Sequence, residues 1–151
     1  MENNALMLQS NVNGTYCSIK PKTLEEKKTL YNALETCDNL VNDCVGAVIN
    51  LKNVYIERRL KDYEEELDSS YVDSETGEVI DKKTVQKTKY RTILFADDGT
   101  TYATGSYGIY NAVAKLIATF GDPETWEEPI KVEFAKRPIG NGKTSLTLKL
   151  V

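Results

Sequence analysis

The sequence predicts a β-rich α+β fold, an OB-like five-stranded Greek-key barrel with one capped helix before the last two strands. Strand-like alternation recurs along the chain, a helical period interrupts it once, and no strand–helix–strand repeat indicates a doubly wound sheet. A chain of 151 residues is long enough for one domain with its own core. We therefore expect a single OB-like domain over residues 1–151. An extra N-terminal helix and a protruding charged arm or hairpin at residues 58–84 would be additions to it.

The first elements are expected to be a short strand and the extra helix. Residues 15–20 alternate weakly, and Pro21 ends that alternation. Thr23 and Glu26 have capping-box spacing, in which each side chain serves the other's backbone donor. A helix to about Glu35 should follow. Its face is expected to carry Leu24, Lys27, Tyr31 and Leu34.

Residues 45–57 predict a long, bent strand. Leu51 and the alternate residues before it fall on one face. Val54 and Ile56 join that face only if one extra residue intervenes near Lys52-Asn53, which is the pattern of a β-bulge. Such a bend is what a small barrel needs in order to close.

Residues 58–84 are mostly charged. Glu64-Glu65-Glu66 lies in a stretch for which a short helix is expected, and residues 75–78 carry a turn signal. We interpret the segment as an arm or long hairpin between two core strands.

A strand, a turn and a capped helix are predicted next. Residues 85–96 read as a strand, Asp97-Asp98-Gly99 as a tight turn, and residues 100–104 as its antiparallel return. Ser106 predicts the N-cap of a helix over residues 107–120, which a glycine and a proline then end. The apolar face of this helix comprises Ile109, Val113, Leu116, Ile117 and Phe120.

The C-terminal segment predicts a hairpin. Ile130, Val132 and Phe134 alternate with polar residues, and Gly140-Asn141-Gly142 suits a type I′ turn. The last strand is expected to turn Leu146, Leu148 and Leu150 inward.

Composition excludes several kinds of catalytic and cofactor site. The chain has no histidine, which removes histidine-based nucleophile systems, histidine zinc sites and a switch near neutral pH. Gly142-Lys143-Thr144 resembles the end of a phosphate-binding P-loop, but the required earlier glycine and following helix are missing. We therefore expect no cofactor and no metal.

Cysteine usage and hydropathy indicate a cytosolic protein without membrane contact. Cys17, Cys37 and Cys44 form no Cys-x-x-Cys pair, so reduced thiols are expected. The N-terminus is not basic, and the apolar runs are too short to span a bilayer.

Charge is segregated along the chain, although the net charge is only −4. Residues 57–78 carry −6 and residues 96–129 carry −5, whereas residues 79–95 and 130–151 each carry +4. The basic segments include predicted strands and therefore predict a basic groove. A groove with aromatic platforms is what single-stranded nucleic acid requires. Lysines that face outward for solubility alone are the alternative explanation.

Nine tyrosines against three phenylalanines fit such platforms, because tyrosine tolerates partial exposure. The candidate stacking residues are Tyr55, Tyr90 and Tyr102, which have polar or basic neighbours. The candidate phosphate contacts are Arg58, Arg59, Lys89, Arg91, Lys136, Arg137 and Lys143. Tyr31 and Tyr110 are expected to pack on their helices. Packing at the core or at a sheet edge is the alternative for each tyrosine.

The block TILFADDGTTYAT at residues 92–104, followed by a serine-capped helix, carries a family resemblance. With Lys131-Val132, the glycine hairpin at 140–143 and Leu146-Thr147-Leu148, it resembles the single-stranded DNA-binding proteins of small protein-primed Bacillus phages. The strand Ala47-Val48-Ile49-Asn50 is also similar. The resemblance covers roughly residues 45–56 and 90–151.

The resemblance implies a replication protein that coats single strands during strand displacement in the cytoplasm of the bacterial host. Single-stranded DNA and phage replication proteins are the implied partners, and a homo-oligomer is a further expectation. Tyrosines contact DNA in that family, and Tyr102 is the one that falls on a matching position. Where another family tyrosine would align, this chain has Leu51.

The leading hypothesis is therefore non-catalytic, sequence-tolerant binding of single-stranded DNA. A second hypothesis is a phage-encoded interaction module that inhibits a host factor through the acidic segment 58–84. An enzyme that uses carboxylates or Cys44 is a third, which the missing general base disfavours.

Overall fold

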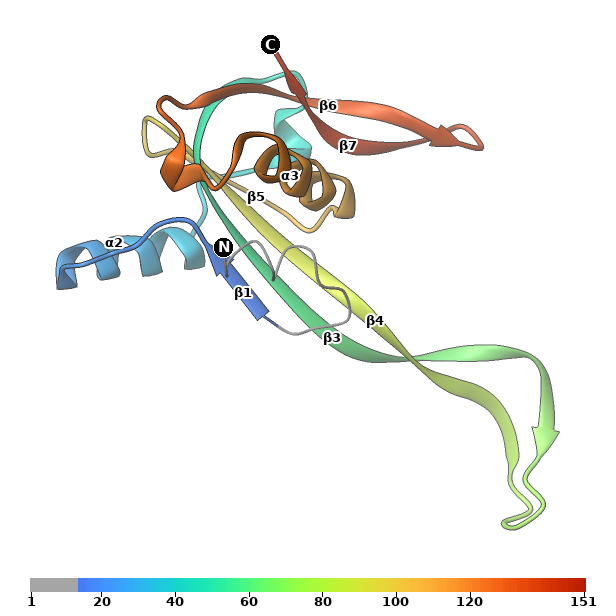
Figure 1. Cartoon of the computed structure of the whole chain (residues 1–151). Coiled ribbons are helices and arrows are strands. Elements are labelled where there is room, and N and C mark those ends of the chain that lie inside the picture. Colours follow the sequence, from blue (N-terminus) through green and yellow to red (C-terminus); the bar gives the residue numbers. More distant parts are fainter. Residues whose placement is uncertain (1–13) are drawn as a thin grey trace.

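The computed structural model describes residues 14–151, which form a curled, mixed sheet of seven strands with two α-helices (Figure 1). The β-rich architecture is as predicted. The strands are β1 (Gly14–Cys17), β2 (Asn39–Leu40), β3 (Val48–Val72), β4 (Val79–Ala96), β5 (Thr101–Thr104), β6 (Ile130–Gly140) and β7 (Lys143–Leu150). The helices are α2 (Leu24–Glu35) and α3 (Tyr107–Phe120), with 3₁₀ turns at Val41–Cys44 and Pro123–Thr125. No helix within residues 14–151 is long and apolar enough to cross a membrane.

Strand β3 is the centre of the sheet and changes partner along its length. The strand order is β2-β5-β4-β3-β6-β7, and β1 pairs with β3 outside this path. The first residues of β3, 48–51, pair with β6, whereas residues 55–58 pair with β1. A register shift between Leu51 and Asn53 separates the two regions, which confirms the predicted bulge. Because of it, Leu51, Val54 and Ile56 all enter one core.

The two faces of the sheet carry separate apolar clusters. The larger cluster includes Leu94 and Phe134 together with the buried face of α3. The smaller one joins Tyr55, Ile93 and Phe95 to α2. Helix α2 therefore turns the second sheet face into a core as well.

The predicted face of α2 is confirmed at Leu34 but is wrong at Leu24 and Tyr31. The helix packs on the sheet through Leu30, Ala33 and Leu34, whereas Leu24 and Tyr31 are exposed. Positions 30, 33 and 34 are the ones that share a helical stripe toward the sheet. The N-cap is confirmed, since Thr23 Oγ1 accepts from the Glu26 N–H at 3.1 Å.

Residues 59–89 of β3 and β4, including their connecting turn, form a two-stranded ribbon, and we call this segment the ribbon. In the described chain its strands pair only with each other, and it projects from the rest of the molecule with a strong twist (Figure 1). Asp73 Oδ1 accepts from the backbone N–H groups of Glu75 and Thr76 at 2.7 and 3.1 Å, which confirms the predicted turn.

The expected short helix at Glu64-Glu65-Glu66 is wrong. These residues belong to β3, and Glu65 and Glu66 lie directly across from Lys83 and Lys82. Opposite charges in cross-strand pairs stabilise a strand pairing. That pairing outweighs the helix propensity of glutamate.

Helix α3 is confirmed at both ends. Ser106 Oγ accepts from the Ile109 N–H at 3.4 Å, and Gly121 ends the helix with φ 86°. Four of the five predicted apolar residues are buried, and Phe120 is exposed instead. Phe120 lies in the last turn and lines a surface hollow.

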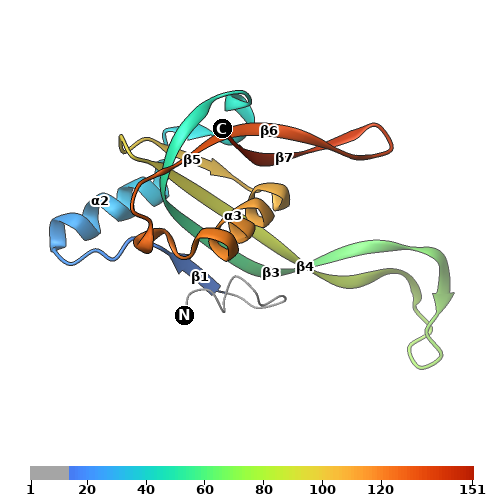
Figure 2. The same ribbon diagram turned by 45° about the horizontal axis from the view of Figure 1, so that its top comes forward.

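The β6–β7 hairpin has the predicted turn, with φ 52° at Asn141 and 72° at Gly142. Leu146 and Leu148 pack against the larger core, but Leu150 is exposed at the end of β7. Figure 2 shows that this hairpin and the ribbon project from the same side of the molecule, with α3 between their bases.

Candidate nucleic-acid interface

Three tyrosines meet where β4 passes the start of α3, and we call Tyr90, Tyr107 and Tyr110 the tyrosine cluster. The ring centroids of Tyr90 and Tyr110 are 4.3 Å apart, those of Tyr90 and Tyr107 5.3 Å, and those of Tyr107 and Tyr110 5.9 Å. Tyr110 is buried, Tyr90 is half-buried and Tyr107 is 59% exposed. The cluster is therefore a packed aromatic base that presents one ring to solvent.

Arg58 links the cluster to strand β3. It lies directly across from Tyr90 in the β3–β4 pairing, and its side chain is only 2% exposed. One Arg58 nitrogen donates a hydrogen bond of 3.3 Å to the Tyr110 hydroxyl. This contact ties α3 to the central strand and positions the rings on both elements.

Burial, followed by the neighbouring Tyr110 and Tyr107 phenols, raises the pKa of Tyr90, while Arg58 opposes the shift. The Tyr90 phenol is therefore uncharged at neutral pH. A neutral ring can stack on a base without repelling the adjacent phosphates.

The position of Tyr107 depends on the next residue, Gly108. A Cβ at Gly108 would collide with the carbonyl oxygen of Leu146 and the hydroxyl of Ser145 on β7. Only glycine lets α3 approach the β7 backbone this closely. The glycine thus fixes the start of α3 against the second hairpin.

Arg137 of the β6–β7 hairpin lies at a hollow beside α3. A hollow of about 330 Å³ lies between α3 and the β6–β7 hairpin. Its lining includes Gly108 and Lys115 of α3 and Arg137 of β6. Arg137 and Gly108, the residue that follows Tyr107, therefore border the same hollow.

An aromatic cluster flanked by two hairpins that bear exposed cations suits the binding of an extended, flexible polyanion with stacking groups. The comparison with known families agrees, because residues 9–151 match a family described as "Phage Single-stranded DNA-binding protein". The chain belongs to that family. The match extends beyond the two blocks that carry the sequence resemblance. Neither the curated proteins nor the solved structures contain a match to this chain.

In this member of the phage single-stranded DNA-binding family, two sequence-predicted contact residues are core residues. Tyr55 is 8% exposed, packs in the cluster beneath α2, and donates a 2.5 Å hydrogen bond to the Glu57 carboxylate. Arg58 is also buried. Neither side chain has the exposure that a stacking or phosphate contact requires.

Two further predicted residues are half-buried. Arg91 donates to the Leu34 carbonyl of α2 at 2.9 Å. Tyr102 packs edge-on against Phe134, with ring centroids 5.2 Å apart. Both side chains therefore support the packing of the molecule.

The remaining predicted cations are exposed, but they do not share one face. Arg59 and Lys89 lie on the ribbon, whereas Lys136, Arg137 and Lys143 lie on the β6–β7 hairpin. Strand alternation also places Lys89 and Tyr90 on opposite faces of β4. A single groove lined by all these residues is therefore not what the fold presents.

Sequence reasoning missed two exposed or half-exposed tyrosines, Tyr107 and Tyr63. Tyr107 falls outside the apolar stripe of α3, which is a signal that could have identified it. Tyr63 lies in the segment interpreted as an acidic arm. The Nζ atoms of Lys87 and Lys89 lie 5.8 and 5.4 Å from the centroid of its ring.

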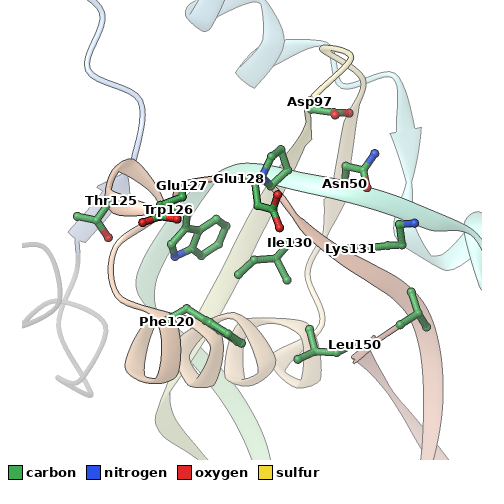
Figure 3. A pocket seen from close by; sticks show the side chains of 12 residues that line it. Asn50, Asp97, Phe120, Thr125, Trp126, Glu127, Glu128, Ile130, Lys131 and Leu150 are labelled. Atoms are coloured by element: carbon green, nitrogen blue, oxygen red, sulfur yellow. The ribbon is translucent and has the colours of Figure 1, made fainter.

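A larger hollow lies at the opposite end of α3, about 20 Å from Tyr107 along the helix. This hollow has a volume of about 760 Å³. The side chains of Phe120, Trp126 and Ile130 point into it (Figure 3). Three carboxylates, those of Asp97, Glu127 and Glu128, also line it, against the one cation of Lys131. Such a lining repels phosphates, so this hollow is unsuited to a DNA backbone.

Proposed function

We propose that this chain binds single-stranded DNA without sequence preference and without a catalytic step, as a strand-protecting protein of phage DNA replication. The observation that carries the proposal is the tyrosine cluster, which lies between the bases of two hairpins that bear exposed cations. Membership of the family supports it. The host cytoplasm is the expected place of action, and phage replication proteins and further copies of the chain are the expected partners.

The binding mechanism combines stacking with phosphate neutralisation. Tyr107 offers an open ring to a base, and Tyr90 supports it from the sheet. The phosphate contacts proposed are Arg59, Lys89, Lys136, Arg137 and Lys143, all of which are exposed. Every base has a π-face, so stacking of this kind is tolerant of sequence.

We further propose that the molecule is one domain built on an OB-like barrel. Five strands, β3 to β7, with α3 inserted before the last two, support this assignment. The curl of the sheet and the bulge in β3 are consistent with barrel closure. In the described residues β7 pairs with β6 and not with β5, so the strands do not close into a complete barrel. Helix α3, which contacts β7 and β4, would cover the gap between them.

Fluorescence anisotropy with a labelled oligo-dT, at low and moderate salt, tests the proposed function. We expect binding that weakens with salt, with a slope of about −0.7 per phosphate neutralised. A duplex of equal length is the control and should bind more weakly. Absence of any anisotropy change at low salt would overturn the proposal.

A further inference from the structure

The ribbon has two chemically different faces, although its average charge is acidic. Side chains alternate along each strand, and residues paired across the strands share a face. The basic face carries Arg59, Lys61, Tyr63 and Glu65 of β3, with Lys83, Val85, Lys87 and Lys89 of β4. The opposite face carries Leu60, Asp62, Glu64 and Glu66, with Lys82, Thr84, Gln86 and Thr88. The basic face thus has five cations and one carboxylate.

Side-chain contacts agree with this assignment. Lys87 forms a 2.8 Å ion pair with Glu65, and the ammonium groups of Lys87 and Lys89 lie 5.8 and 5.4 Å from the centroid of Tyr63. All four side chains therefore meet on one surface. Tyr63 is at its centre, half-buried and flanked by lysines.

The basic face places like charges directly opposite one another. Arg59 pairs with Lys89, and Lys61 pairs with Lys87 in the next rung on that face. Like charges in this position destabilise a strand pair. On the other face, by contrast, Glu66 lies across from Lys82, and Glu64 from the neutral Thr84. The repulsion is therefore concentrated where an external anion could relieve it.

We infer that the basic face of the ribbon is a second contact surface for single-stranded DNA, on which Tyr63 stacks a base and the flanking cations neutralise phosphates. The inference rests on the proposed function and adds a contact on the face of β4 opposite to Tyr90, since Lys89 and Tyr90 alternate along the strand. Rungs on one face recur about every 6.6 Å, a spacing that an extended single strand can follow. An aromatic ring set among cations favours nucleic acid over an acidic protein, since only the nucleic acid supplies bases to stack.

The charge test compares two neighbouring lysines on opposite faces. Lys83→Gln removes a cation from the basic face, and the matched control Lys82→Gln removes one from the other face. We expect the salt slope for oligo-dT binding to fall by about 0.7 for Lys83→Gln and to stay unchanged for Lys82→Gln. For the triple variant Lys61→Gln/Lys83→Gln/Lys89→Gln, the salt slope of oligo-dT binding should fall by about 2.

The stacking test compares two tyrosines of the ribbon. Tyr63→Leu should weaken binding at least about 5-fold, while Tyr63→Phe retains affinity. Tyr71→Leu, near the ribbon tip, is the control and should bind as the unmodified chain does. The triple variant removes the like-charge pairs of Lys89 with Arg59 and of Lys61 with Lys87, but also the favourable pair of Lys83 with Glu65. Urea unfolding therefore accompanies each binding measurement and separates lost binding from lost folding.

The outcomes separate this inference from the proposed function. If the unmodified chain fails to bind oligo-dT at low salt, both are overturned. If it binds and Lys83→Gln has the same salt slope as Lys82→Gln, the basic face is overturned while the proposed function stands. A Tyr63→Leu variant with full affinity would remove the stacking role in the same way.

Discussion

The Arg58 guanidinium donates a hydrogen bond of 3.3 Å to the Tyr110 hydroxyl and joins the central strand β3 to helix α3. The sequence suggests a phosphate contact for this residue, but the arginine is almost fully buried. Arg58→Met should therefore lower the free energy of unfolding by about 2–4 kcal/mol, measured by urea denaturation.

The same variant separates a structural role from a DNA contact. Since no phosphate reaches a buried side chain, the salt slope for oligo-dT binding should stay unchanged under conditions where Arg58→Met is folded. A fall of about 0.7 would instead show that Arg58 does meet the DNA backbone.

Tyr107 presents the open ring of the tyrosine cluster, and its replacement tests stacking directly. Tyr107→Leu should weaken oligo-dT binding by about 1–3 kcal/mol, the usual contribution of one stacked base. Tyr31→Leu is a matched control, because Tyr31 is also largely exposed (64%, against 59% for Tyr107) but lies on α2. Equal affinities for the two variants would exclude Tyr107 as a contact.

Gly108 controls how closely α3 approaches β7. Gly108→Ala adds a methyl group where the Leu146 carbonyl and the Ser145 hydroxyl already lie, so the helix start must shift. We expect a loss of about 1–3 kcal/mol in unfolding free energy and weaker oligo-dT binding. Gly105→Ala provides the comparison, because a Cβ there would make only an ordinary 3.5 Å contact. An unchanged free energy of unfolding for Gly108→Ala would show that α3 can shift away from β7 at no cost.

Local signals in the sequence predict α3 and the β6–β7 turn. Ser106 caps the helix with its own side chain, and Asn141-Gly142 tolerates positive φ without outside help. The ribbon strands cannot be predicted in this way. Glu65 is a good helix former, and its partner Lys83 is far along the chain, so only the cross-strand pairing decides its structure.

The same distinction between local signals and long-range contacts applies to the residues of the candidate site. Alternation beyond the bulge places Arg58 on the face of Ile56, so the sequence itself contains a signal for its burial. The burial of Tyr55 depends on α2 covering the other face through Leu30 and Leu34. That packing joins distant segments and leaves no local pattern. The cluster around Tyr107 is likewise formed only by tertiary contact.

The raised pKa of Tyr55 predicts that the free energy of unfolding falls at alkaline pH. Burial, and then the hydrogen bond to the Glu57 carboxylate, raises the pKa of Tyr55 to about 12. The unfolded chain has an ordinary tyrosine pKa near 10 and releases that proton first. The stabilisation is therefore complete below about pH 10 and is lost as the pH rises toward 12. Urea midpoints should fall across this window and fall less in Tyr55→Phe; equal falls would exclude Tyr55 as the responsible group.

The β6–β7 hairpin should contribute phosphate contacts of its own. Arg137 borders the hollow beside α3, and Lys143 follows the exposed turn. Arg137→Gln and Lys143→Gln should each reduce the salt slope of oligo-dT binding by about 0.7, since each removes one phosphate contact. Lys131→Gln is the control, because Lys131 lies near the start of β6 and lines the acidic hollow at the far end of α3. A slope that falls equally in all three variants would mean that the hairpin acts only through net charge. A slope unchanged in Arg137→Gln and Lys143→Gln would confine the DNA path to the tyrosine cluster and the ribbon.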